Sequence, residues 1–298
     1  MISFQQLLFS AAVTAAASAA AGTGPQARNP ILPDFHADPS AREWDGRMWI
    51  YPSHDLPGST GWDMVDWHCF SSKDLVHWTD HGIIFSLKDV SWADKWAWAP
   101  DCVRRNGRYF FYFPADDQIG VAVADRPEGP FRDALGRPLI SRGESGTRVM
   151  DPAVFIDDDG GAYLYFGQNE ARVVRLKDDM VSFDGPVLPL AVRDFHEGLW
   201  MHKRKGVYYL SYCSLRGDGE LKNRMEYATS NSPLGPFVHR GLIIDNRSRN
   251  VHGSIAPFQG EWVLFYHVQG PSWYERRVCM EKIRFRKDGT IREVRITK

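Results

Sequence analysis

The sequence lacks several features that define other structural classes. After the N-terminus, no long stretch repeats apolar residues at the 3.6-residue period of a helix, which argues against a helical or α/β fold. No segment rich in proline, glycine and serine divides the 298 residues, so we expect a single large domain. A chain of this length has ample apolar surface to bury in one core.

Cysteine is scarce, and its spacing argues against the usual cysteine chemistry. The four cysteines stand far apart, and none forms a CxxC pair: Cys69, Cys102, Cys213 and Cys279. Because no two of them have the spacing of zinc ligands, we expect buried free thiols and no zinc site built from cysteine.

An excess of either charge is also lacking. Lysine and arginine number 36, and aspartate and glutamate number 37, which leaves a net charge of −1 with both signs mixed along the chain. Nucleic acids and anionic membranes attract proteins through a surplus of positive charge. We therefore expect neither as the main partner, and we expect a monomer.

The first two dozen residues differ in character from the rest. Residues 7–22 read LLFSAAVTAAASAAAG, an apolar run ending in small residues, as a secretory signal peptide does before its cleavage site. No lysine or arginine precedes the run, which leaves a retained anchor or a misassigned start codon as alternatives. We expect a signal peptide at 1–21, a short leader at 22–28, a mature domain at 29–298, and a secreted or periplasmic protein.

What the chain does contain is a fivefold repeat. Five times an apolar and aromatic strand follows a turn glycine, with an acidic or imidazole residue a few positions upstream at nearly the same phase. The five pairs are Asp38 with Gly46, Asp101 with Gly107, Asp151 with Gly161, Glu197 with Gly206, and His252 with Gly260. Successive glycines are 61, 54, 45 and 54 positions apart, which is typical of propeller blades.

Each unit of the repeat has the pattern of an antiparallel sheet. Aromatic and β-branched residues alternate after the glycine, as in residues 163–166 and 207–210, and predict a strand after a hairpin turn. A second phrase with two polar turns and a short apolar run predicts two further strands, and it begins at Ser71, Ala124, Leu176 and Thr229. Four strands in each of five units predict an all-β, five-bladed β-propeller. The alternative is a two-sheet sandwich or jelly roll, whose strands need not carry a repeating polar phase.

Three of the repeated polar residues are carboxylates of the kind that cleave sugars. Hydrolysis of a glycosidic bond needs one group that protonates the departing oxygen and another, on the opposite face, that acts as base or nucleophile. Asp38, Asp151 and Glu197 begin three different blades, so a propeller would direct all of them into one channel. An Asp-Pro pair by itself is usually a turn, but the matched phase with Glu197 and His252 favours a site.

These segments resemble glycoside hydrolase family 43. NPILPDFHADPS, DPAVFIDDDGGAYLYFG and EGLWMHKRKGVYYLSYC are similar to the three signature segments of that family, in the same order. WAWAPDCVRRNGRYFFYFP and HGSIAPFQGEWVLFYH are similar to its second and fifth blades. The resemblance spans residues 29–298, and five ordered segments are a specific signal.

The resemblance implies a role for each carboxylate. Asp38 matches the general base of the family, Glu197 its general acid, and Asp151 the carboxylate that orients the acid and tunes its pKa. A negative charge beside an acid disfavours ionisation and keeps the proton available near neutral pH. Enzymes of the family invert the anomeric centre, so we expect the carboxyl groups of Asp38 and Glu197 about 6.5 to 9.5 Å apart, rather than about 5 Å.

His252 has two interpretations. It is either a satisfied polar residue of the core or, as the resemblance implies, a residue beneath the active site near a bound calcium ion. One neutral imidazole makes a calcium site only where water completes the oxygen shell. Such an ion would be structural, and the chemistry is expected to need no cofactor.

Substrate contacts are expected from the second blade. Trp98 is placed near the mouth of that blade, where its ring could stack on a sugar; the alternative is that it packs in an aromatic cluster with Trp92 and Trp96. Asp101 shares the repeated phase and is expected either to position the ligand or to form a turn.

Further substrate contacts are expected around the base. Phe35 and His36 precede Asp38 closely and are expected to wall the pocket. Arg276 resembles an arginine that reaches the pocket from the last blade of the family.

The identity of the sugar is expected from the length of the chain and from the resemblance. The chain ends soon after the fifth unit, without the C-terminal β-sandwich of the larger β-xylosidases of the family. The first expectation is therefore an α-L-arabinofuranosidase acting on arabinose- or xylose-containing plant glycans, followed by β-xylosidase, endo-arabinanase and exo-β-galactanase. Two other classes stay open: a retaining fructan-type hydrolase, with its carboxyl groups about 5 Å apart, and a non-catalytic sugar-binding propeller.

Overall fold

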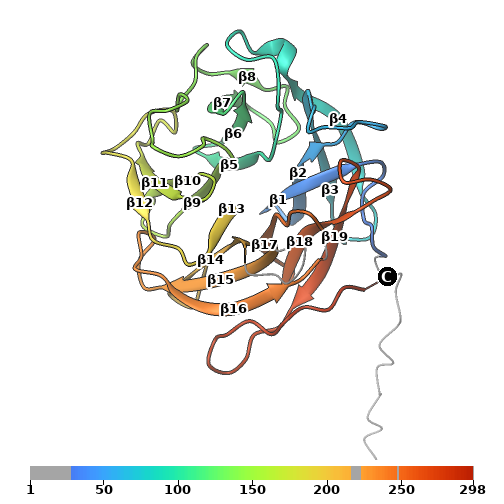
Figure 1. Cartoon of the computed structure of the whole chain (residues 1–298), viewed down its shortest axis with the longest axis vertical. Coiled ribbons are helices and arrows are strands. Elements are labelled where there is room, and N and C mark those ends of the chain that lie inside the picture. Colours follow the sequence, from blue (N-terminus) through green and yellow to red (C-terminus); the bar gives the residue numbers. More distant parts are fainter. Residues whose placement is uncertain (1–27, 216–222, 247, 298) are drawn as a thin grey trace, which may run out of the picture.

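Five antiparallel sheets lie in a ring in the computed structural model, which describes residues 28–215, 223–246 and 248–297 (Figure 1). The prediction of a five-bladed β-propeller is confirmed, and the two-sheet sandwich is excluded. The predicted signal peptide and residues 22–27 of the predicted leader lie outside the described residues. Within the described ranges, no helix has the length and hydropathy needed to cross a membrane.

The first two blades have four strands each. The first contains β1 (His36–Trp44), β2 (Arg47–His54), β3 (Asp66–Ser72) and β4 (Thr79–Ser86), and the 3-10 helix η1 (Leu87–Asp89) follows it. The second contains β5 (Asp101–Arg105), β6 (Arg108–Ala115), β7 (Gln118–Ala124) and β8 (Arg132–Asp133).

The remaining blades repeat this order along the chain. The third contains β9 (Ala153–Ile156), β10 (Ala162–Phe166), β11 (Ala171–Leu176) and β12 (Leu188–Leu190). The fourth contains β13 (Phe195–Arg204), β14 (Val207–Ser214), β15 (Arg224–Ser230) and β16 (Val238–Ile244). The fifth contains β17 (Gly253–Phe258), β18 (Glu261–Gln269) and β19 (Arg276–Ile283). The first strand of each blade lies innermost, where it meets the first strands of the neighbouring blades.

The turn glycines join the two inner strands of each blade. Four of these hairpins have positive φ at both turn positions, as a two-residue type I′ turn requires: Asp45-Gly46, Asn106-Gly107, Lys205-Gly206 and Gln259-Gly260. The third blade differs because its loop is longer, and Gly160 takes the positive φ, 85°, in place of the predicted Gly161.

The second repeated phrase holds one strand and not the predicted two. The third strands of the first four blades end at or just after the residues that begin the phrases, namely Ser71, Ala124, Leu176 and Thr229. The apolar residues of the third strand therefore precede each phrase, and the phrase itself supplies the turn and the fourth strand.

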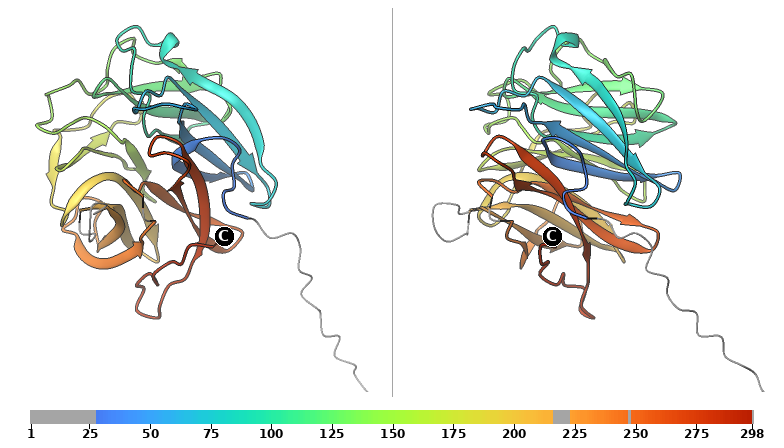
Figure 2. Two further views of the ribbon diagram at one scale, coloured as in Figure 1. Left: turned by 45° about the vertical axis from the view of Figure 1, so that its right-hand side comes forward. Right: turned by 90° about the vertical axis from the view of Figure 1, so that its right-hand side faces the viewer.

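The ring closes between the first and fifth blades through the N-terminal segment. The side-chain oxygen of Asn29 accepts from the backbone N–H of Met280 at 2.9 Å, and its amide donates to the Met280 carbonyl at 3.1 Å. The N–H of Ile31 donates to the carbonyl of Val278 in β19 at 2.9 Å. Figure 2 shows the two ends of the described chain side by side, where Asn29 also donates to Thr297. The prediction of four strands per unit is thus wrong for the fifth blade, whose outer edge is covered by the other end of the chain.

Aromatic side chains fill the space between blades. Between the first and second blades, the ring of Trp67 lies 5.3 Å from that of Phe113, and Phe85 lies 4.9 Å from Phe113. All four cysteines are buried and unpaired, which confirms the prediction of free thiols.

An ion pair between a buried aspartate and a mostly buried arginine crosses the ring where the inner strands meet. The carboxylate of Asp101, at the start of β5, accepts from Arg42 Nη2 of β1 at 2.5 Å and from the backbone N–H of Val154 in β9 at 2.6 Å. The guanidinium of Arg42 lies 4.2 Å from the centre of the Trp200 ring in β13. The indole N–H of Trp200 in turn donates to the carbonyl of Ile255 in β17 at 2.9 Å. One connected set of contacts therefore joins the inner strands of all five blades.

Breaking this ion pair should destabilise the whole ring. Asp101→Asn leaves the guanidinium of Arg42 without its counter-charge, and a one-sided change to a buried pair costs about 3 to 5 kcal/mol. We expect the free energy of unfolding, measured by urea titration, to fall by about 3 kcal/mol. The control is Asp45→Asn, which removes the exposed partner of Arg104 and should cost less than about 1 kcal/mol. Equal effects of the two substitutions would contradict the central role of Asp101.

Candidate active site

At three carboxylates of the repeat, the backbone departs from regular strand geometry. Asp38 and Asp151 have φ values of 51° and 52°, a region that is costly for residues with a side chain, and each precedes a proline. Asp38 also lies at an irregularity of the β1–β2 pairing, and Glu197 at one of the β13–β14 pairing. Irregularities of this kind turn side chains out of the alternation of a strand. They direct the three carboxylates into one space at the entrance to the ring.

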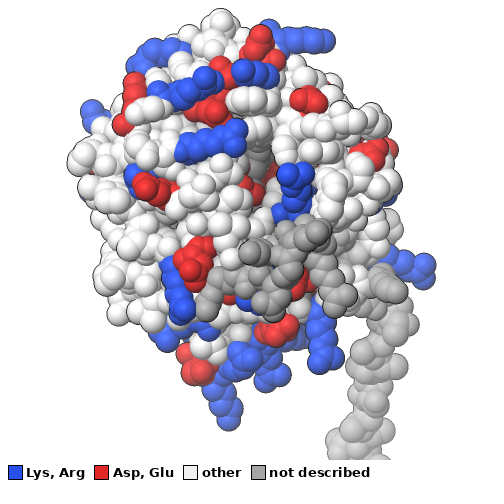
Figure 3. All heavy atoms as spheres, viewed as in Figure 1, with Lys and Arg blue, Asp and Glu red and all other residues white. Residues whose placement is uncertain are grey.

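That space is a pocket of about 260 Å³. Figure 3 shows this face of the molecule hollowed near its centre, with charged side chains of both signs around the hollow. Six of the predicted site residues line the pocket: Asp38, Trp98, Asp151, Glu197, His252 and Arg276.

Asp38 is held as an anion by a buried arginine. Arg276 Nη1 donates to Asp38 Oδ1 at 2.8 Å, while its Nε and Nη2 donate to the two carboxylate oxygens of Asp55 at 2.9 and 2.8 Å. Ser53 Oγ donates to the other oxygen of Asp38 at 2.7 Å. Burial by itself would raise the pKa of Asp38, but the charge of Arg276, aided by His267 and His252, holds that pKa well below its ordinary value. The carboxylate is therefore ionised at neutral pH.

Asp151 has the opposite electrostatic setting. Its Oδ2 accepts one hydrogen bond, from the backbone N–H of Gly198 at 3.2 Å. Burial, and then the neighbouring carboxylates of Glu197 and Asp38, raise the pKa of Asp151 well above its ordinary value. Asp151 therefore favours holding a proton that the ion-paired Asp38 does not take up.

Glu197 is oriented by neighbours that sequence reasoning did not identify. Gln168 Nε2 donates to Glu197 Oε2 at 2.9 Å, and His196 Nε2 lies 3.5 Å from the same oxygen. Arg148 Nη1 donates to Gln168 Oε1 at 3.3 Å and so fixes which end of the amide faces Glu197. These contacts thus hold the side chain of Glu197 at its Oε2 oxygen.

Gly198 is required by the packing beside Glu197. Its φ is 67°, and a Cβ there would lie 3.0 Å from ring carbons of His252. Only glycine combines this backbone conformation with so close an approach.

Asp101 does not reach the pocket, which corrects the expectation that it positions the ligand. It lies six positions before Gly107, whereas Asp38 lies eight before Gly46 (107−101 and 46−38). Two residues of strand amount to about 7 Å along its axis. Asp101 therefore lies deeper along the propeller axis than the other repeated polar residues. There its carboxylate pairs with Arg42 and also accepts a hydrogen bond from Ser40.

Phe35 and His36 also lie outside the pocket lining. The guanidinium of Arg277 lies 5.1 Å from the ring of Phe35. In a regular strand His36 and Asp38, two positions apart, would share a face, but the β1–β2 pairing is irregular between Ala37 and Ser40 and Asp38 has a positive φ. His36 instead stacks on His54 with ring centres 5.0 Å apart. The expectation that the two residues wall the pocket is corrected accordingly.

Trp98 both lines the pocket and packs against an aromatic neighbour. Its ring is stacked on Trp96 with centroids 5.1 Å apart, and its indole N–H donates to the carbonyl of Trp62 at 2.9 Å. Trp92 instead stacks on Phe113, away from this pair. Stacking of a sugar on Trp98 stays a prediction.

The unpredicted lining residues follow from antiparallel topology. They include Trp62, Met64, Arg148, Gln168, His196 and Asn250. In an antiparallel hairpin the end of the second strand lies beside the start of the first. Residues just after the second strand of one blade, such as Gln168, therefore lie on the same face of the propeller as residues just before the first strand of the next blade. This rule could have identified them from the sequence.

His252 lies between two of the carboxylates. Its Nδ1 is 3.8 Å from Asp38 Oδ1 and 3.7 Å from Asp151 Oδ2. Calcium takes about six to eight oxygen ligands, but in the described ranges His252 belongs to no group of three side chains with ligand atoms close enough to share an ion. Water would have to supply most of the shell, and no catalytic step is assigned to such an ion.

A buried group of carboxylates, one ion-paired and one favouring its proton, in a pocket at the axis of a propeller defines a glycosidase site. The model of glycosyl hydrolases family 43 matches residues 27–291. The chain belongs to this family and is a glycoside hydrolase, which confirms the resemblance and sets aside the fructan-type and non-catalytic alternatives. Its chemistry requires no cofactor.

Named relatives differ in the sugar that they release. The chain is 36% identical to a xylosidase/arabinosidase of Humicola insolens, over 88% of this chain and 98% of the relative. It is 34% identical to a β-D-galactofuranosidase of Aspergillus niger, over 91% and 86%. Among solved structures, a β-xylosidase/α-arabinofuranosidase from a compost microbial metagenome, in complex with xylotriose, superposes with a TM-score of 0.82 at 33% identity, over 90% and 97% of the two chains.

The electrostatics of Asp151 predict a conflict between stability and activity. Because its folded pKa is raised above the unfolded value of about 3.9, its ionisation opposes folding as pH rises through that window. Asp151→Asn should therefore raise the free energy of unfolding at pH 7, by about 1 to 2 kcal/mol. The gain should shrink toward zero below about pH 4, where both side chains are neutral. Urea titrations at pH 7 and pH 3.5 measure the difference, and a pH-independent effect would contradict the assignment.

Proposed function

We propose that this chain is an inverting α-L-arabinofuranosidase that removes terminal sugars from arabinose- or xylose-containing plant glycans. The observation that carries the proposal is the unequal charge setting of the carboxylates in one pocket. Asp38 is ion-paired with Arg276, while no lysine or arginine among the residues that the structure describes forms an ion pair with Asp151 or Glu197.

Asp38 would act as the general base. A water molecule beside it gives a proton to the carboxylate while the water oxygen attacks the anomeric carbon from the face opposite the leaving group. Arg276 keeps Asp38 ionised and ready to accept that proton. The same arginine fixes the orientation of the carboxylate, since it also binds Asp55 with two nitrogens.

Glu197 would act as the general acid. It transfers a proton to the glycosidic oxygen as the bond from that oxygen to the anomeric carbon breaks, so that the sugar leaves with inverted configuration. Asp151 supports this step because two adjacent buried carboxyl groups resist carrying negative charge at the same time. For this mechanism the carboxyl groups of Asp38 and Glu197 must stand about 6.5 to 9.5 Å apart.

The size of the pocket supports removal of one sugar at a time. At about 260 Å³ it lies just below the range of about 300 to 1,000 Å³ that is usual for drug-sized ligands. A single pentose is small enough for such a space. Relatives named for both xylose and arabinose make β-xylosidase the second candidate, and the Aspergillus niger relative adds β-D-galactofuranoside as a substrate to test.

Two further expectations belong to the proposal. The apolar run at residues 7–22 supports export of the protein to the cell exterior or periplasm. The calcium ion expected near His252 would be largely hydrated and would act on the local charge and not on the substrate. Export is tested by locating the protein in fractionated cells, and calcium by titration of the chelated protein.

The first experiment identifies the sugar and the stereochemistry together. The protein is incubated with aryl α-L-arabinofuranoside, aryl β-D-xyloside and aryl β-D-galactofuranoside, and proton NMR follows the anomer released at early times. We expect arabinose released first as the inverted anomer. Release of xylose with inversion would change the assigned substrate but support the same mechanism. Release of any sugar with retention would contradict the assignment of Asp38 as base.

Two substitutions separate the acid from the base. Asp38→Asn should lower kcat by about 100- to 10,000-fold on every substrate, because no group then accepts the proton of the water. Glu197→Gln should show a similar loss on oligosaccharides but a much smaller one on aryl glycosides whose leaving group needs no proton. Asp45→Asn makes the same chemical change at an exposed turn outside the pocket, and it should leave kcat nearly unchanged. Equal losses for Glu197→Gln on good and poor leaving groups would contradict its role as acid.

A further inference from the structure

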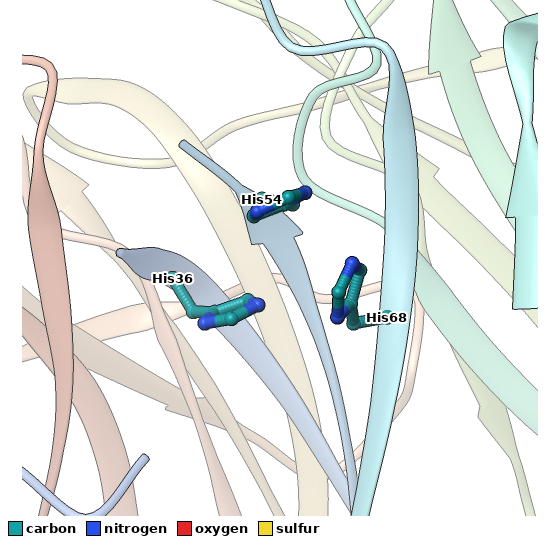
Figure 4. Close-up of side chains that lie close together, drawn as sticks. All are labelled: His36, His54 and His68. Atoms are coloured by element: carbon teal, nitrogen blue, oxygen red, sulfur yellow. The ribbon is translucent and has the colours of Figure 1, made fainter. Parts of the chain in front are cut away.

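Three histidines meet on the first blade, outside the active-site pocket (Figure 4). His36 begins β1, His54 ends β2, and His68 lies in β3. One ring nitrogen from each lies within 4.8 Å of the other two. In the ranges that the structure describes, this is the one group of three or more side chains whose ligand atoms are close enough to share a metal ion.

Hydrogen bonds leave a ring nitrogen of His36 and one of His54 free to bind a metal. His36 Nδ1 lies 3.0 Å from the carbonyl oxygen of Pro33, which can only accept, so Nδ1 carries the proton and Nε2 keeps its lone pair. His54 Nδ1 lies 2.6 Å from Asp66 Oδ1 in the same arrangement. Metal-binding histidines are held in this way, with the second nitrogen bonded to a carbonyl or carboxylate.

The cluster also contains buried nitrogens without a hydrogen bond. Nε2 of His36 and both ring nitrogens of His68 are buried and have no hydrogen-bond partner among the described residues. His36 is only 2% exposed. An unsatisfied buried polar atom costs about 1 to 3 kcal/mol, and coordination of a metal ion would remove that cost. This evidence is independent of the spacing of the three rings.

The rings of His36 and His68 suit a metal in their charge state as well. Burial, followed by the neighbouring histidines, lowers the pKa of His36 to about 3, and burial lowers that of His68. Both rings are therefore favoured in the neutral form that binds metals. The carboxylate of Asp66, 3.7 Å from His68 Nε2, provides a negative charge beside the site.

We propose that His36, His54 and His68 form a binding site for one first-row transition-metal ion, of which zinc is the probe. Neutral imidazole nitrogens suit such ions, whereas calcium and magnesium prefer oxygen. A tetrahedral zinc ion would draw the three nitrogens to about 3.4 Å from one another. The side chains of His54 and His68 are 19% and 15% exposed, which leaves a path for the ion and room for water as the fourth ligand.

The metal would brace the strand ends that carry the base and its arginine. Asp38 follows His36 by two positions in β1, and Asp55, which binds Arg276, directly follows His54. An ion held by three strands would therefore restrain both carboxylates from outside the pocket. The site is structural and separate from His252.

Zinc titration of the whole protein tests the proposal. The chain is freed of metal with a chelator, transferred to chelator-free buffer, and titrated with zinc chloride in a calorimeter. We expect one zinc per chain and a higher melting temperature. His54→Gln and His68→Gln should weaken binding at least 100-fold or so, and Asp66→Asn by about 10- to 100-fold. His77→Gln changes an exposed histidine of the same blade and should bind zinc as the wild type does.

Cobalt in place of zinc reports the geometry. A tetrahedral site with three nitrogen ligands should give intense visible absorption with the wild-type protein and with His77→Gln, and lose it with His68→Gln. Failure of the wild-type protein to bind zinc at about 100 μM would overturn the proposal even where a variant does not fold. Unchanged affinity in His54→Gln and His68→Gln would overturn it as well. These readouts do not depend on which sugar the enzyme releases.

Discussion

The ion pair between Arg42 and Asp101 is the constraint on which the rest of the structure depends. Closing five sheets into a ring brings their inner strands together at an axis, where polar groups are cut off from water and need partners. Asp101 meets this need by binding the first and third blades, and Arg42 extends the contact to Trp200 in the fourth. The separation of the inner strands is set by these contacts, and so is the convergence of the catalytic carboxylates above them.

The layer above the ion pair is organised by an imbalance of charge. The described pocket brings three carboxylates together but pairs a guanidinium with only Asp38 among them. Asp38 is ionised for that reason, while burial and the neighbouring carboxylates favour a proton on Asp151. An inverting glycosidase needs this difference between base and acid. Burial of the Asp151 carboxyl group is unfavourable for folding, as is common for ionisable residues of active sites.

The repeat in the sequence was sufficient to predict much of this site. A polar residue at a similar distance before each turn glycine must recur at a similar height in each blade, because strands rise by a constant distance per residue. Asp38, Asp151, Glu197 and His252 all line the pocket as this argument requires. Asp101 did not follow, since a shift of two residues places it a layer deeper. His36 did not follow because the β1–β2 pairing is irregular between Ala37 and Ser40, so residues two positions apart no longer share a face there.

The sequence by itself therefore determined the blades, the turns and the candidate carboxylates, since each depends on local periodicity and turn chemistry. Tertiary structure decided what surrounds them. Arg276 binds Asp38 across 238 positions, and the N-terminal segment covers the fifth blade only once the ring has closed. The three clustered histidines come from three strands with no common sequence motif. Such pairings depend on the register and closure of the whole ring, and no local pattern of residues encodes either of these.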